Sequence, residues 1–261
     1  AGGMASLFLG PEPKDLSYAK TIIFWGTNIT DSQVHNWHFV LDAMENGAKL
    51  ICIDPRYSET AAKSHEWVRV RPRSDSILAL SMIQVIIEEN LIDRDYCIKH
   101  TVAPFLVRQD NGLFLRQSDI DGSDNAGYLT MDADSNKLIA LETVANPALL
   151  GTFDVTLHDG SKLQVKTALQ MLKDEADKYK PAEAERLTLV PADKIVEIAR
   201  IYATNTPSTI YTGFGVDRWD NADQVGRGIA TLGVITGQIA KKGASPLGAM
   251  GQSALQFTIS D

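Results

Sequence analysis

The sequence has few of the cysteines that would define a zinc or iron–sulfur site. Only two cysteines occur in 261 residues: Cys52 lies in an apolar stretch of strand character and Cys97 in a helical pattern. Two isolated cysteines cannot by themselves supply a zinc or iron–sulfur site, and they do not resemble a disulfide framework. We interpret both as buried structural thiols.

Long apolar runs and a basic excess are also missing. No run is long enough to cross a bilayer, so no membrane span is expected. The formal net charge is −8, whereas proteins that bind nucleic acids usually carry a basic excess, so we expect no nucleic-acid partner. The segment AGGMASLFLG at residues 1–10 lacks the basic start and apolar centre of a signal peptide.

Two glycine fingerprints are absent as well. The chain has no G-x-G-x-x-G, which disfavours an ordinary nicotinamide site, and no G-x-x-x-x-G-K-[ST], which excludes a P-loop.

Strand-like and helix-like patterns alternate through the first hundred residues. Short apolar stretches predict strands at 21–25, 48–54 and 67–72. Helical spacing predicts helices at 33–46, ended by Gly47, at 60–66, and at 77–91 with Ser74 or Asp75 as the N-cap. Strands that are nearly all apolar and alternate with helices indicate an α/β fold, in which helices flank both faces of a Rossmann-like parallel sheet.

The pattern breaks at 108–165, which is rich in Asp, Gly, Ser and Asn. Asp159-Gly160 lies between alternating residues and predicts a hairpin. Helical periodicity returns at 166–179, 192–203 and 222–240, with a strand in 208–216 and an irregular segment over the last twenty residues. We therefore predict one α/β domain over residues 1–261, with a loop and hairpin insertion at about 108–165.

The turn after the first predicted strand is Gly26-Thr27-Asn28-Ile29-Thr30-Asp31-Ser32. Gly26 permits close backbone approach, and a helix start would offer free N–H groups to a phosphate. The same residues are equally good caps for a turn that binds no ligand.

The turns after the second and third strands carry charge. Asp54 follows the second strand, where an acidic residue of a dinucleotide-binding fold accepts hydrogen bonds from ribose, and Arg56 follows it. Arg69, Arg71 and Arg73 alternate, so a strand would place them on one face as a local positive focus. A carboxylate at Asp75 suits the donor edge of guanine. The alternatives are a capping role for Asp54 and a solvated edge strand for the arginines, but together the three turns predict a nucleotide site.

Two longer stretches carry a family resemblance. The first starts at WGTN and continues through GAKLICIDPRYSETAAKSHEWVRVRPRSDS; the second comprises GFGVDR and IATLGVITGQIAKKGA. They resemble the molybdopterin oxidoreductases of the dimethyl sulfoxide reductase family, in order across most of the chain. The resemblance is weakest in 108–165.

The resemblance implies a cofactor and the residues that bind it. Members hold molybdenum or tungsten between two molybdopterin guanine dinucleotides in a protein of four domains, and this chain resembles the third, a Rossmann-like domain that binds one dinucleotide. The loop near the phosphates would comprise Gly26, Thr27, Asn28, Thr30, Asp31 and Ser32. The guanosine would meet Ile53, Asp54, Pro55 and Arg56, and the guanine end Arg73, Ser74 and Asp75. Phe214 and Arg218 would reach toward the pterin.

The resemblance also implies a longer parent enzyme. The metal ligand and, in some members, a 4Fe–4S cluster are expected upstream of this chain, so we predict no catalytic residue and no metal ligand within it. Its partners would be an electron-transfer subunit together with the remaining domains of the parent. The fragment alone would be inactive. The pattern does not indicate the compartment, and any export signal would precede this fragment.

Two other functions fit the turns less well. One is a non-catalytic Rossmann-like nucleotide-binding module, such as the middle domain of a thiamin-diphosphate enzyme. The other is an NAD(P)-dependent dehydrogenase, which the missing glycine fingerprint disfavours.

Overall fold

The computed structural model describes residues 12–216 and 218–245, which divide into two compact units. The first unit contains residues up to Ile92 and from Ala176 onward, and the second unit is Asp93–Glu175. The predicted insertion at 108–165 falls within the second unit, which extends beyond it in both directions. The predicted segment at 1–10 lies outside the described residues, as do all but the first four of the last twenty residues, which were predicted to be irregular.

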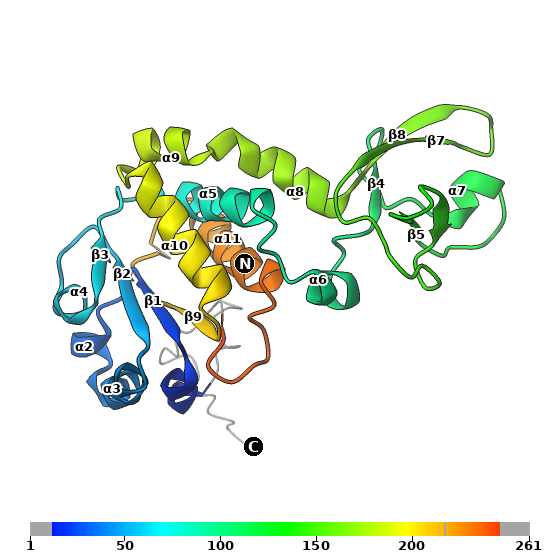
Figure 1. The fold of residues 1–261 in the computed structure, drawn as a ribbon. Coiled ribbons are helices and arrows are strands. Elements are labelled where there is room, and N and C mark those ends of the chain that lie inside the picture. Colours follow the sequence, from blue (N-terminus) through cyan, green and yellow to red (C-terminus); the bar gives the residue numbers. More distant parts are fainter. Residues whose placement is uncertain (1–11, 217, 246–261) are drawn as a thin grey trace, which may run out of the picture. The chain divides into compact units, whose positions relative to one another are not determined.

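A parallel sheet of four strands forms the centre of the first unit, in the order β3-β2-β1-β9. The strands are β1 (Thr21–Trp25), β2 (Lys49–Ile53), β3 (Glu66–Val68) and β9 (Ser208–Thr212). Every neighbouring pair is parallel, which confirms the predicted Rossmann-like fold (Figure 1).

The carboxyl ends of the strands lie at one level. Trp25, the last residue of β1, is opposite Ile53 of β2 and Thr212 of β9, and Ile53 is opposite Val68 of β3. The loops that follow all four strands therefore leave the sheet from the same edge, where ligands bind in open α/β sheets.

Both faces of the sheet are covered, as its continuous apolar strands predict. All five residues of β1 are buried. On one face, Ile22 and Phe24 pack in a cluster with Leu50 and with residues of the flanking helices. The alternate residues, including Trp25, point to the opposite face, because successive strand side chains alternate.

The first unit contains both α-helices and short 3₁₀ turns. The α-helices are α2 (Ile29–Ser32), α3 (Trp37–Glu45), α4 (Glu59–Lys63), α5 (Asp75–Glu88), α9 (Pro181–Thr188), α10 (Ala192–Thr204) and α11 (Ala222–Ile235). The 3₁₀ turns are η1 (Pro13–Tyr18), η2 (Val34–Asn36) and η3 (Asp177–Tyr179). The predicted helix at 33–46 is thus split, and α9, which begins with a proline in its first turn, was not predicted as a separate helix.

The strand predicted at 67–72 is confirmed as β3 but is shorter, so the expectation that it carries Arg69 and Arg71 was wrong. Strand β3 ends at Val68, although buried Val70 between exposed Arg69 and Arg71 preserves the alternating pattern. The N–H of Arg71 donates to the carbonyl of Thr188 at the end of α9, so this segment bonds to a helix end and leaves the sheet.

The second unit is built around an antiparallel sheet of three strands in the order β4-β8-β7. Its strands are β4 (Leu106–Arg108), β7 (Thr152–Thr156) and β8 (Lys162–Thr167), and β5 (Leu129–Met131) pairs with β6 (Leu138–Ala140). Its helices are α6 (Arg94–His100), α7 (Gln117–Asp121) and α8 (Ala168–Ala176), which ends at the boundary with the first unit. The predicted hairpin at Asp159-Gly160 is confirmed as β7–β8.

No helix in the described part of the chain combines the length and apolar character needed to cross a membrane.

Candidate functional site

The loops after β1 and β9 pack against each other through their backbones. Gly26 has a φ of +60°, and its carbonyl accepts a hydrogen bond from the N–H of Gly215. A Cβ added to Gly215 would lie 2.5 Å from that carbonyl oxygen, and one added to Gly213 would lie 2.6 Å from the Cβ of Thr27. Glycine is therefore needed on both loops for their contact.

Trp25 and Asp75 connect the end of β1 to the start of α5. The indole Nε1 of Trp25 donates a 2.8 Å hydrogen bond to Oδ1 of Asp75, and both side chains are buried. Burial raises the pKa of Asp75, and the hydrogen bond from Trp25 opposes that shift. The bond holds the carboxyl group at the sheet edge in one orientation.

Asp54 follows β2 directly and is half-buried. Its backbone N–H donates to the carbonyl of Val68, and its Oδ1 accepts a 2.8 Å bond from the N–H of Arg56. Burial raises the pKa of Asp54 while Arg56 lowers it, and the charge of Asp54 contributes to the raised pKa of Asp75. The two predicted carboxyl groups are thus close enough to interact.

Asn28 is hydrogen-bonded to the start of α4. Its Oδ1 accepts from the N–H and hydroxyl of Thr60 and from the hydroxyl of Thr30, and its Nδ2 donates to Glu59. The amide of Glu59 and the side chain of Asn28 lower the pKa of Glu59. The side chain of Asn28 therefore shapes the loop, and its hydrogen-bonding groups are occupied by protein.

The expected helix start after β1 is only the four-residue helix α2. The N–H of Thr30 donates to Thr60 Oγ1. The backbone N–H groups of Thr27, Asn28 and Ile29 have no acceptor among the described residues, so this turn retains donors for an anion.

Arg73 adopts a φ of +73° and makes an ion pair with Asp220, at 2.5 and 2.6 Å from its Nη2 to the two carboxylate oxygens. Asn221 donates to the carbonyl of Arg73. The predicted N-cap position at Ser74 is confirmed, but its hydroxyl donates to the carbonyl of Arg71 and makes no capping bond to the helix. Nothing in the local sequence around Asp220 indicated its pairing with Arg73, since 147 residues separate the two.

The remaining predicted residues lie on the same loops. Ile53 is fully buried at the end of β2, while Pro55, Arg56, Asp31 and Ser32 are exposed. Phe214 is 51 % exposed, and the guanidinium carbon of Arg218 lies 5.1 Å from the centre of its ring. The described residues contain no cluster of three or more His, Cys, Asp or Glu side chains suited to a metal ion.

Comparison with known proteins agrees with the predicted resemblance. The family model described as molybdopterin oxidoreductase matches residues 5–256. The chain is 33 % identical to the alpha subunit of perchlorate reductase from Dechloromonas aromatica, over 89 % of this chain and 29 % of that protein. It is 34 % identical to a putative dimethyl sulfoxide reductase catalytic subunit from Halobacterium salinarum, over 92 % of this chain and 29 % of that protein.

A solved structure shows the same fold. Acetylene hydratase from Pelobacter acetylenicus superposes with a TM-score of 0.59 at 19 % sequence identity, covering 94 % of this chain and 25 % of that one. The chain thus spans less than a third of the length of the relatives it matches.

Proposed function

Because the chain belongs to the molybdopterin oxidoreductase family, we propose that its first unit binds the guanine dinucleotide end of one of two molybdopterin cofactors. The observation that carries this proposal is the level carboxyl edge of the four parallel strands, where the loops of Gly26, Asp54, Asp75 and Gly215 gather. Nucleotides bind at this edge in doubly wound folds.

The acidic groups suit the guanine and ribose. Guanine presents adjacent N–H donors, and ribose presents hydroxyl donors, so both require acceptors. Asp75, oriented by Trp25, would accept from the guanine edge, and Asp54 would accept from the guanosine. Pro55 and Arg56, exposed in the same turn, would lie against the nucleoside.

The loop after β1 suits the phosphates. The N–H groups of Thr27, Asn28 and Ile29 have no acceptor among the described residues, and consecutive backbone N–H groups form anion-binding concavities. Thr30, Asp31 and Ser32 would complete this wall, and Arg73 would supply positive charge at the guanine end. Phe214 and Arg218, stacked on each other, would extend toward the pterin.

The parent protein would be a longer oxidoreductase, of which this chain is one cofactor-binding domain with an insertion. When bound, the cofactor would supply redox chemistry at molybdenum or tungsten, and this chain would hold and orient the dinucleotide. The metal ligand, any 4Fe–4S cluster and the second half of the pocket would come from the remaining domains, and the parent would pass electrons to or from an electron-transfer subunit. The chain alone would be inactive.

A nucleotide titration tests the proposal. Calorimetry and thermal shift would compare GMP and GDP with AMP and NAD, using wild-type protein and Asp75→Ala. We expect guanine-selective stabilisation that is lost in D75A. A preference for NAD, or equal binding of GMP and AMP, would contradict the proposal.

A control variant tests whether the loss of any carboxylate from this unit weakens nucleotide binding. Asp193→Ala removes an exposed carboxylate from the start of α10 in the same unit. The D193A variant should bind GMP as the wild type does.

A further inference from the structure

The second unit contains a small cavity with mixed apolar and charged walls. Its volume is about 260 Å³. Its lining residues are Arg108, Leu113, Phe114, Arg116, Asp119 and Tyr128. Apolar and aromatic walls with a few placed polar groups are typical of sites for small molecules.

The backbone holds the walls of this cavity in place. The N–H of Arg108 donates to the carbonyl of Leu113, and Phe114 forms an antiparallel bridge with Val107. Arg116 forms a similar bridge with Tyr128, so their side chains lie next to each other. Leu115, between the two wall residues Phe114 and Arg116, points instead into the core of the unit.

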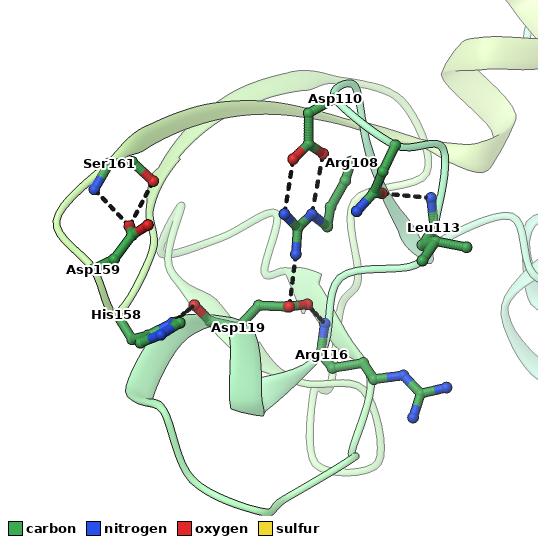
Figure 2. A network of polar contacts seen from close by, with 9 residues as sticks. Arg108, Asp110, Leu113, Arg116, Asp119, His158, Asp159 and Ser161 are labelled. Atoms are coloured by element: carbon green, nitrogen blue, oxygen red, sulfur yellow. Dashed lines mark hydrogen bonds and ion pairs between the residues drawn. The ribbon is translucent and has the colours of Figure 1, made fainter.

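Two of the wall residues, Arg108 and Asp119, belong to an ion network in which the acidic groups already have partners. Arg108 donates through Nε and Nη2 to both oxygens of Asp110 and through Nη1 to Oδ1 of Asp119 (Figure 2). The second oxygen of Asp119 accepts from the N–H of Arg116. These bonds fix the wall and leave the two carboxylates little capacity to bind a cation.

Arg116 has a different environment. Figure 2 shows its side chain extending away from the Arg108 network. Its guanidinium carbon lies 5.3 Å from the centre of the Tyr128 ring, and it forms no ion pair with any carboxylate of the described residues. The charges of Arg108, Asp110, Asp119 and Arg116 sum to zero, and among the two arginines the exposed Arg116 is the one whose guanidinium has no carboxylate partner in the described residues. It lines the cavity together with the apolar surfaces of Phe114, Tyr128 and Leu113, of which Leu113 is 64 % exposed.

We propose that this cavity binds a small planar carboxylate, such as an aromatic acid. The carboxylate would pair with the guanidinium of Arg116, which matches its geometry, and the flat apolar body would pack against Phe114 and Tyr128. The cavity is slightly smaller than the usual range for drug-sized ligands, which restricts the body to about one ring.

Benzoate is the first probe. Its binding to the full chain would be measured by NMR, through the assigned signals of the second unit. Benzamide tests the need for charge, benzylammonium tests its sign, and acetate tests the need for a ring. We expect saturable shifts at the cavity residues with benzoate and at least about tenfold weaker binding of the other three.

The variant Arg116→Gln should reduce the affinity for benzoate to that for benzamide. Arg186→Gln is the matched control, because it removes one charge from an exposed arginine of the first unit. Tyr128→Leu should weaken benzoate binding while acetate binding stays the same, and thermal melting would verify folding of each variant. The proposal would be overturned by the absence of saturable benzoate binding, by unchanged affinity in R116Q, or by equal binding of benzylammonium.

Discussion

Trp25 at the end of β1 donates a hydrogen bond to Asp75 at the start of α5, although 50 residues separate them in the chain. The bond joins the end of β1 to the start of the helix that follows β3, at the edge from which the candidate site is built. Within the described residues, Trp25 is the one side-chain donor to this carboxyl group. Loss of this hydrogen bond should affect both the stability of the protein and nucleotide binding.

The variant Trp25→Phe keeps most of the ring but removes the donor. The buried Oδ1 of Asp75 would then lack its partner, so we expect the free energy of unfolding to fall by about 1–3 kcal/mol. Urea denaturation would measure this. Trp37→Phe is the control, because Trp37 packs with its ring centre 6.1 Å from that of Phe24, and its indole makes no hydrogen bond to the described residues. An equal loss in both variants would show that ring volume, rather than the hydrogen bond, is responsible.

The buried carboxyl groups predict a pH dependence. Burial raises the pKa of Asp75 above that of the unfolded chain, so the folded protein retains this proton to higher pH. The contribution to stability is present below the unfolded pKa of about 3.9 and is lost as the pH rises through the folded pKa.

The variant Asp75→Asn should isolate this contribution, because its amide oxygen still accepts from Trp25 but carries no charge. We expect D75N to be more stable than the wild type at neutral pH, with the difference shrinking as the pH falls toward about 4. Urea denaturation over a pH series would measure the free energy of unfolding of both proteins. Taking the difference between them cancels the opposite pH dependence that the exposed carboxylates contribute to each. A difference that is constant with pH would contradict the prediction.

Much of this architecture could be predicted from the sequence, for a physical reason. Strands buried on both faces must be continuously apolar, so β1, β2 and β9 were visible as TIIFW, KLICI and STIYT. The position of their carboxyl ends then followed from parallel pairing. The family resemblance indicated which chemical groups of the cofactor would bind at this edge, and those assignments stay predictions.

Other features depend on partners far along the chain. The arginine pattern after β3 has strand character, but the pairing of Arg71 with Thr188 ends the strand. The ion pair between Arg73 and Asp220 depends on the folded path of the loop after β9.

The same ion pair predicts an effect on nucleotide affinity. The side chains of Arg73 and Asp220 are 57 % and 73 % exposed, so Asp220→Asn should change the free energy of unfolding by less than about 1 kcal/mol. If Arg73 contacts the nucleotide, the loss of its competing carboxylate should raise GDP affinity about three- to tenfold.

Calorimetry with wild type, D220N and the double variant R73A/D220N would measure this gain. The double variant should not show the gain in GDP affinity, because that gain requires Arg73. An equal gain in the double variant would show that Asp220 repels the nucleotide directly, without acting through Arg73.

Two glycine substitutions should have opposite effects. A Cβ at Gly215 would lie 2.5 Å from the carbonyl oxygen of Gly26, and backbone cannot move aside cheaply, so Gly215→Ala should reduce the free energy of unfolding by about 1–3 kcal/mol. A Cβ at Gly226, within α11, meets nothing within 4 Å, so Gly226→Ala should increase it by about 0.5–1 kcal/mol. Urea denaturation would measure both changes in the free energy of unfolding.

Because G215A would separate the loops after β1 and β9, it should also weaken GMP binding, whereas G226A should not. Stabilisation by both substitutions would mean that the two loops do not pack as closely as the structure shows.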